Sequence, residues 1–266
     1  MFYLFSPQLR IRIMKPPTGR PLGINFGYRF GAGILMPIMR AITKRTWLAT
    51  EKIPQAGPAI FCSNHVSYID ALVLAHYLFE NGRAARFIGK ESVFKIPIVG
   101  WVLYKAEQIP VKRQSDSAAI ALAEAIAALK MGHAIAIYPE GTLTRDPDLW
   151  PMTGKTGAVR LALASGAPLI PIAQWGDHKI LAPYSKILKI FPAKPITLKC
   201  GDPIDLSKWQ GKADDPEAVE AATNFVMTNL AKMVGELRNE NPPMELFDIR
   251  KTDLPRTGNF RKNRRR

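Results

Sequence analysis

The chain has 266 residues, of which 47% are hydrophobic and 22% are charged, so wholesale disorder is excluded and there is enough sequence for one large α/β domain or two small domains. It carries 37 Lys and Arg residues against 22 Asp and Glu residues, and this net charge of +15 indicates a polyanionic partner, either nucleic acid or an anionic membrane. The two cysteines, Cys62 and Cys200, lie in apolar strand-like runs without a CxxC pattern or a Cys/His cluster, so neither a disulfide framework nor a zinc site is expected.

Both ends of the chain lack the periodicity of regular structure. Residues 1–23 contain several Pro, Gly and basic residues and are expected to be a flexible lead. Residues 241–266 are polar and end in a run of Lys and Arg, so a disordered basic tail is expected there.

Residues 24–50 are expected to form an N-terminal amphipathic helix, with basic residues between the apolar ones. Apolar side chains recur there at every fourth position: Phe26, Phe30, Ile34, Ile38 and Ile42. Such a stripe is typical of a helix that lies in a membrane interface, and equally of one that packs its apolar face on a protein core. The sequence leaves both alternatives open. No run reaches the roughly 20 apolar residues that a transmembrane helix needs.

Apolar runs and helix-like stretches alternate through the centre of the chain. Buried strands are expected over residues 59–62, 86–88, 108–111, 134–138, 169–173 and 196–200. Helices are expected over residues 69–79, 117–131, 156–164 and 216–238. This alternation predicts one α/β catalytic domain over residues 51–240, with a largely parallel or mixed central sheet flanked by helices.

A histidine follows the first of these strands, in the block Asn64-His65-Val66-Ser67-Tyr68-Ile69-Asp70. The end of a buried strand lies at the open edge of an α/β sheet, where ligands bind. Because positions five apart differ by about 140° on a helix, His65 and Asp70 meet only if His65 lies on the loop before the helix. Ser67 is then the expected N-cap.

A carboxylate against one imidazole nitrogen fixes the tautomer and leaves the other nitrogen as a general base. No serine or cysteine nucleophile accompanies His65 and Asp70, which indicates that the substrate supplies the nucleophile. The spacing alone is weak evidence for a catalytic pair, since a bare HxxxxD is more often a capping histidine beside a solvated aspartate.

Other polar residues follow further strands. The segment 138–145 offers a carboxylate, a permissive turn and a fork-shaped phosphate donor: Glu140, Gly141, Thr142 and Arg145. Lys90 and Arg113 would add cations at two more strand ends. Taken singly, each of these features is more often a solvated turn or a surface charge.

Together these blocks resemble the glycerophospholipid acyltransferases, in particular the 1-acylglycerol-3-phosphate acyltransferases. NHVSYID matches the NHxxxxD block of that family in full. GKESVFKIPIVGW with QIPVKR resembles the second block, YPEGTLTR the third and APLIPIAQWG the fourth. The four blocks occur in the family's order between residues 60 and 176.

The resemblance implies acyl transfer from acyl-CoA or acyl carrier protein to the free hydroxyl of 1-acyl-sn-glycerol-3-phosphate, which gives phosphatidic acid. It implies no metal and no prosthetic group. A related lysophospholipid or glycolipid acceptor is the alternative within the class. The basic surface would hold the protein on anionic lipid at roughly 1 kcal/mol per well-placed cation, as a peripheral or monotopic protein on the cytoplasmic face of the cell membrane. Nucleic-acid binding is not favoured, because no recognised signature is present. A catalytically silent lipid-surface protein is not favoured either, because the His65/Asp70 pair is intact.

The resemblance also implies roles for individual residues. His65 would be the base and Asp70 its orienting group, and Arg113, with Lys90 near it, would bind the acceptor phosphate. Three residues of the third block would shape the acceptor site: Glu140, Gly141 and Thr142. One departure is Leu143, which stands where the family usually has arginine. Either Arg145 reaches the same phosphate from two residues later, which we favour because one phosphate usually needs more than one cation, or the headgroup preference differs.

Overall fold

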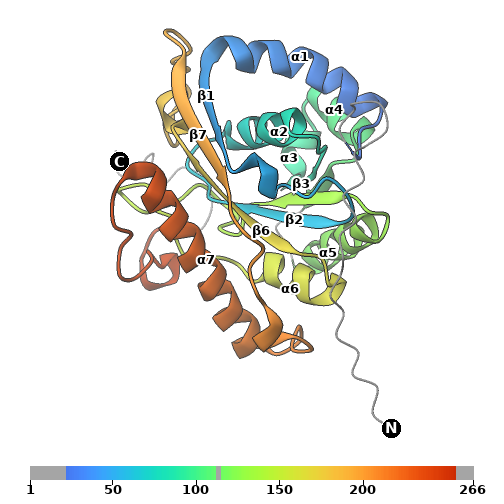
Figure 1. The fold of residues 1–266 in the computed structure, drawn as a ribbon, viewed down its shortest axis with the longest axis vertical. Coiled ribbons are helices and arrows are strands. Elements are labelled where there is room, and N and C mark those ends of the chain that lie inside the picture. Colours follow the sequence, from blue (N-terminus) through green and yellow to red (C-terminus); the bar gives the residue numbers. More distant parts are fainter. Residues whose placement is uncertain (1–21, 112–114, 256–266) are drawn as a thin grey trace.

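A mixed seven-stranded sheet forms the centre of the part of the chain that the computed structural model describes, residues 22–111 and 115–255 (Figure 1). Its strand order is β1-β7-β6-β2-β5-β3-β4. Neighbouring strands are parallel except β6 and β7, which are antiparallel. The strands are β1 Thr43–Leu48, β2 Ala59–Ser63, β3 Arg86–Lys90, β4 Ile109–Val111, β5 Ala134–Ile137, β6 Leu169–Trp175 and β7 Lys194–Cys200. The predicted α/β fold with a mixed sheet is confirmed.

Helices cover both faces of this sheet (Figure 1). They are α1 Phe26–Ile42, α2 Asp70–Glu80, α3 Glu91–Phe94, α4 Val99–Lys105, α5 Ser115–Lys130, α6 Gly157–Ser165 and α7 Pro216–Arg238. Successive strand residues point to opposite faces. Accordingly Ile60 and Cys62 of β2 pack with α5, α6 and α7, whereas Ala59 and Phe61 pack with α2. Every residue of β2 and the following Asn64 are buried, so His65 is the first residue after the strand that is partly exposed.

The six predicted strands and four predicted helices are all present, with ends within two residues of those expected. Helix α7 begins at Pro216 because the Asp215 carboxylate accepts hydrogen bonds from the backbone N–H groups of Glu217 and Ala218. Two short helices, α3 and α4, were not predicted, since four and seven residues are too few to show a clear helical period.

The helix predicted over residues 24–50 is too long. Helix α1 ends at Ile42, and the next six residues form β1, which pairs in parallel with β7 from Thr43 opposite Lys194. A strand is favoured here by Thr43, Thr46 and Trp47. The basic residues between them resembled the polar side of the preceding helix, so the helix was predicted to continue. The sheet of the catalytic domain therefore begins at Thr43 instead of residue 51.

The periodic stripe of α1 faces outward. Four of its five apolar side chains are exposed: Phe26, Phe30, Ile34 and Ile38. The helix instead packs inward with a second set of residues, Tyr28, Ala32, Met36 and Met39. The alternative that the stripe packs on the core is therefore wrong. Within residues 22–111 and 115–255, no helix has both the length and the apolar content needed to cross a membrane.

Part of the predicted C-terminal tail is ordered. The backbone N–H of Thr153 donates to the carbonyl of Phe247, and Arg250 forms ion pairs with Glu220 of α7 and with Asp248. Residues 241–255 are thus attached to the domain by contacts with segments far away in the sequence, which their polar composition does not reveal. Residues 256–266 and the lead 1–21 lie outside the described residues.

Candidate active site

The predicted His65–Asp70 pair is formed at the carboxyl edge of the sheet. His65 lies on the loop after β2, Asp70 is the first residue of α2, and His65 Nδ1 lies 2.9 Å from Asp70 Oδ2. The side chain of His65 is 18% exposed and that of Asp70 is fully buried. Nδ1–H donating to the carboxylate leaves the lone pair of Nε2 available as a base.

The turn between the two residues wraps around the carboxylate. Asp70 Oδ2 also accepts hydrogen bonds from the backbone N–H groups of Val66 at 2.6 Å and Ser67 at 2.8 Å. The N-cap expected at Ser67 is wrong, because its hydroxyl donates to the carbonyl of Leu181 and Asp70 itself binds the N–H groups before the helix. Three donors on one oxygen fix the position of the carboxylate that orients His65.

The surroundings of His65 keep its imidazole neutral. Its ring stacks on that of Tyr138 with centroids 4.3 Å apart, and burial lowers the pKa of His65 to about 3. Burial raises the pKa of Asp70, while the N–H groups of Ser67 and Val66 oppose this rise. A neutral imidazole at pH 7 is the protonation state that a general base requires.

The third sequence block holds the backbone of His65 on both sides. Glu140, which is buried, accepts hydrogen bonds through Oε1 from the N–H of His65 at 2.8 Å and through Oε2 from the N–H of Met152 at 3.3 Å. The N–H of Thr144 donates to the carbonyl of His65 at 2.7 Å. Gly141 has φ +65°, and a Cβ there would lie 3.0 Å from Lys155 Cε, so the turn requires glycine.

Replacing Glu140 with alanine should therefore destabilise the fold. Two N–H groups would lose their acceptor at about 1–3 kcal/mol each, or about 2–6 kcal/mol together. At about 2–4 °C per kcal/mol, this lowers the melting temperature by roughly 4–24 °C. Thermal unfolding followed by circular dichroism measures this, with Glu140→Gln as the matched variant that keeps one side-chain oxygen and should lose less. Equal melting temperatures for wild type and Glu140→Ala would contradict the assigned contacts.

Leu143 and Arg145 lie on the same loop, and both are buried. Leu143 packs inside, and its carbonyl accepts a hydrogen bond from the hydroxyl of Tyr184 at 3.1 Å. The guanidinium carbon of Arg145 lies 4.8 Å from the centroid of the Tyr184 ring, over its face. Thr142 is a hydrogen-bond partner of Tyr184 as well. Tyr184 thus contacts this loop at three residues: Thr142, Leu143 and Arg145.

Of the two other predicted cations, Lys90 lies further along the same edge. Lys90 is exposed at the carboxyl end of β3, where it stands in register with Val111 of β4. Strand β5 separates β3 from β2, so Lys90 and His65 share an edge of parallel strands without being on adjacent ones. Arg113 lies outside the described residues.

Several buried polar residues beside the pair were not predicted. Asn64 and Gln174 exchange hydrogen bonds, with Asn64 Nδ2 donating to the carbonyl of Gln174 and the N–H of Gln174 donating to Asn64 Oδ1. This ties the end of β2 to the end of β6. Asp177 is fully buried beyond β6, and its burial, together with the nearby Asp70 carboxylate, raises its pKa. Because Asp70 accepts three hydrogen bonds, Asp177 is the better of the two to hold a proton. The only feature of the sequence that could have indicated these three residues is that each is a polar residue close to the end of a predicted strand.

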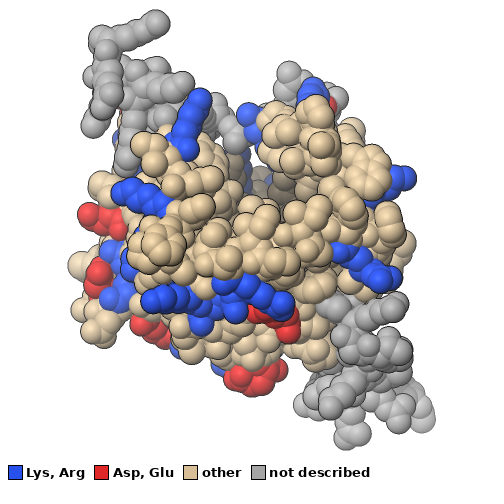
Figure 2. Space-filling model, turned by 90° about the horizontal axis from the view of Figure 1, so that it is seen from above, with Lys and Arg blue, Asp and Glu red and all other residues tan. Residues whose placement is uncertain are grey.

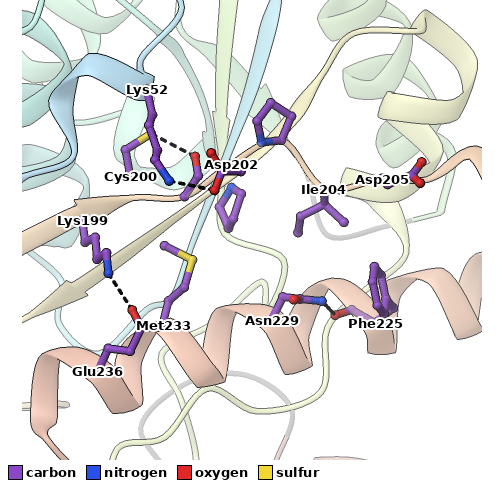
Figure 3. A pocket seen from close by; sticks show the side chains of 13 residues that line it. Lys52, Lys199, Cys200, Asp202, Ile204, Asp205, Phe225, Asn229, Met233 and Glu236 are labelled. Atoms are coloured by element: carbon purple, nitrogen blue, oxygen red, sulfur yellow. Dashed lines mark hydrogen bonds and ion pairs between the residues drawn. The ribbon is translucent and has the colours of Figure 1, made fainter.

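A separate pocket of about 420 Å³ lies at the opposite edge of the sheet, between the carboxyl end of β7 and α7 (Figure 3). Its lysines are already paired: Lys52 with Asp202 at 2.7 Å and Lys199 with Glu236 at 2.7 Å. His65 does not line this pocket, which is therefore not part of the candidate active site.

The His65–Asp70 pair lies at the end of β2 and is held by the loop after β5, and proteins similar to this chain are known. Residues 45–175 match the family model described as Acyltransferase. The curated relatives include the 1-acyl-sn-glycerol-3-phosphate acyltransferase BAT2, chloroplastic, of Brassica napus, which is 32% identical over 133 residues, 49% of this chain and 37% of the relative. The 1-acyl-sn-glycerol-3-phosphate acyltransferase of Borreliella burgdorferi is 32% identical over 151 residues, 53% of this chain and 58% of the relative.

The fold is also that of a solved structure. The crystal structure of the 1-acyl-sn-glycerophosphate (LPA) acyltransferase PlsC from Thermotoga maritima superposes with a TM-score of 0.61 over 79% of this chain and 82% of that chain, at 23% sequence identity. The chain spans between 37% and 58% of the length of the two curated relatives described above.

Proposed function

We propose that this acyltransferase transfers a fatty acyl group from an acyl thioester to the free hydroxyl of 1-acyl-sn-glycerol-3-phosphate, which gives phosphatidic acid. The observation that carries the proposal is the 2.9 Å contact between His65 Nδ1 and Asp70 Oδ2 at the sheet edge. Both curated relatives described above are named for this reaction. The donor is acyl-CoA or acyl carrier protein.

In the proposed reaction, Nε2 of His65 takes the proton of the acceptor hydroxyl, and the oxygen attacks the thioester carbonyl carbon. The ester C–O bond forms, the C–S bond breaks, and the proton on His65 passes to the departing thiolate. Asp70 stabilises the imidazolium that exists between these steps. Glu140 and Thr144 hold the backbone of His65 so that Nε2 keeps its direction.

The low pKa of His65 predicts the pH dependence of turnover. Because the base acts in its neutral form, activity is lost as pH falls through the pKa of His65, and burial places that pKa at about 3. We therefore expect kcat at saturating substrates to stay level from pH 8 down to well below 6.5, the ordinary histidine value. A half-maximal kcat near pH 6.5 or above would contradict a buried neutral base.

Arg113 is proposed to bind the acceptor phosphate, with Lys90 near it and Arg145 as a second cation. Arg113→Ala should raise KM for the acceptor about 10- to 100-fold, because a charge-assisted hydrogen bond contributes about 1.5–3 kcal/mol, and should leave KM for the thioester unchanged. Lys112→Ala, the neighbouring cation, is the matched control. Equal losses for both substrates would show that Arg113 has another role.

The proposal also specifies the headgroup of the acceptor lipid, a phosphate. Leu143 is buried where the family usually has arginine, so a different lysophospholipid or a glycolipid is the second candidate acceptor. Thiol release from acyl-CoA by the purified protein distinguishes them, with 1-acyl-sn-glycerol-3-phosphate, its dephosphorylated analogue and no acceptor in parallel. Release only with the phosphorylated acceptor supports the proposal. Release with neither acceptor would redirect the search to other headgroups or to carrier-protein donors.

We further propose that α1 lies on an anionic membrane, at the cytoplasmic face of the cell membrane. The exposed stripe of α1 continues onto α4, because the rings of Phe30 and Trp101 meet edge to face at 5.7 Å and Tyr104 is also exposed. Figure 2 views the molecule from the side on which α1 lies in Figure 1 and shows Lys and Arg side chains around a broad uncharged surface. An apolar stripe with flanking cations suits an anionic lipid interface.

A further inference from the structure

A second apolar element projects from the loop between β6 and β7. Residues 186–192, which we call the lysine loop, are all exposed. Its four large apolar side chains are Ile187, Leu188, Ile190 and Phe191. Phe191 is 90% exposed and Ile187 is 70% exposed, although single exposed apolar residues are ordinary and only a cluster of this kind indicates a binding surface.

The backbone of this loop is held in place while its side chains point outward. The N–H of Lys189 donates to the carbonyl of Ile180, and Leu181 and Leu188 form an antiparallel bridge. The N–H of Ile187 donates to the hydroxyl of Ser185. The exposed apolar surface is therefore built into the fold.

The charges around the loop all have one sign. Residues 178–198 contain four lysines and neither Asp nor Glu: Lys179, Lys186, Lys189 and Lys194. Apolar side chains between lysines, whose stems can lie along the apolar surface while the ammonium groups stay in water, fit the boundary between headgroups and acyl chains of an anionic bilayer. A protein partner of ordinary composition would not require this exclusion of acidic residues.

The loop lies beside α1 and is attached to the active site. Lys194, three residues after Phe191, pairs with Thr43, the residue that follows α1. Figure 1 shows the turn before β7 at the same end of the molecule as α1. At its base, the carbonyl of Leu181 accepts from Ser67, and Tyr184 donates to Leu143. Whatever the loop binds is therefore held close to both blocks that position His65.

We propose that the lysine loop inserts its apolar side chains into an anionic phospholipid bilayer as a second contact beside α1. Contacts at two separate points fix the orientation of the molecule on the surface, and the carboxyl edge of the sheet then faces the bilayer from which a lipid acceptor enters. The role of this orientation in catalysis rests on the proposed function, whereas the contact itself is measured without turnover.

An environment-sensitive fluorophore on an introduced cysteine tests the contact in the full chain. Cys62 and Cys200 are both fully buried, so labelling is confined to the new site. The test site is Phe191→Cys, and the matched control is Met244→Cys, a fully exposed position after α7. With vesicles of 70% phosphatidylcholine and 30% phosphatidylglycerol, we expect a several-fold gain in emission at position 191 and none at position 244.

An unchanged signal at position 191, or equal signals at both positions, would overturn the proposal. So would an equal gain with pure phosphatidylcholine vesicles, or a gain that follows protein concentration without vesicles, which would indicate a second copy of the chain as the occupant. In vesicle sedimentation, the double variant Ile190→Ser and Phe191→Ser should bind about tenfold or more weakly than wild type, with Met244→Ser unchanged. If the double variant bound as wild type does, the loop would not insert.

These outcomes are separable from those of the proposed function. Absence of thiol release by the unmodified protein with a water-soluble short-chain acceptor would overturn the reaction and leave the vesicle results standing. Normal release combined with a silent probe at position 191 would overturn only the loop contact.

Discussion

Replacing His65 with alanine is expected to lower kcat by about 10³-fold or more while leaving the fold intact. The imidazole is the only base assigned to the acceptor hydroxyl, and general-base catalysis contributes about 10²–10⁴-fold. The side chain makes few contacts that stabilise the fold beyond its stacking on Tyr138 and its bond to Asp70. Thiol release measures kcat, and circular dichroism measures the melting temperature.

His133→Ala is the matched control for this variant. His133 lies on the turn after α5, and its N–H donates to the carbonyl of Ala128, away from the pair. Its removal should leave kcat within about twofold of wild type, as surface substitutions usually do. Added imidazole should restore part of the activity of His65→Ala and should have no effect on His133→Ala. Full activity of His65→Ala would refute the proposed mechanism.

Replacing Asp70 with asparagine is expected to lower kcat by about 10²-fold or more. The amide oxygen can still accept from the N–H groups of Val66 and Ser67, so the turn should persist, but the negative charge that stabilises the imidazolium of His65 is lost. The loss should appear in kcat and leave KM for both substrates almost unchanged, because Asp70 is fully buried and has no surface for substrate.

The neighbouring carboxyl group supplies the comparison for Asp70→Asn. Asp177 is equally buried but has no hydrogen bond to His65 among the described residues, and its raised pKa favours the neutral form that asparagine resembles. Asp177→Asn should therefore keep most of the activity. If both variants lost activity to the same extent, the charge on Asp70 would not be the decisive property.

The strands inside the domain were predictable because each contains a short apolar run, which in β2, β5 and β6 is buried almost throughout. The ladder partner of β1 was not, since Thr43 pairs with Lys194, about 150 residues later. Its sequence, Thr-Lys-Arg-Thr-Trp-Leu, also has exposed positions that look like the polar side of a helix. The sequence of an edge strand shows which of its residues are apolar, but its pairing partner is far away in the sequence and cannot be read from it.

The site was predictable to the extent that its residues lie close together in sequence. His65 and Asp70 are five residues apart, and their geometry follows from the loop before α2. The contact of Glu140 with the N–H of His65 spans 75 residues and depends on β2 and β5 being neighbours, which the order of the strands along the chain does not fix. The sequence could identify Glu140 as part of a site, but its contact with the backbone of His65 could be found only from the structure.

The double attachment of His65 to the loop after β5 limits how the length of the chain can vary. Strands β2 and β5 are in register from Ala59 opposite Ala134, so the lengths of the stretches that leave them are matched to each other. One residue inserted between β5 and Thr144 would pull either Glu140 or Thr144 off the backbone of His65. The loops that join α2, β3, β4 and α5 between them are under no such constraint and can change length at little cost. Length is therefore fixed over a few residues at each strand end and within the packed helices and strands, and is free only in the loops that join them.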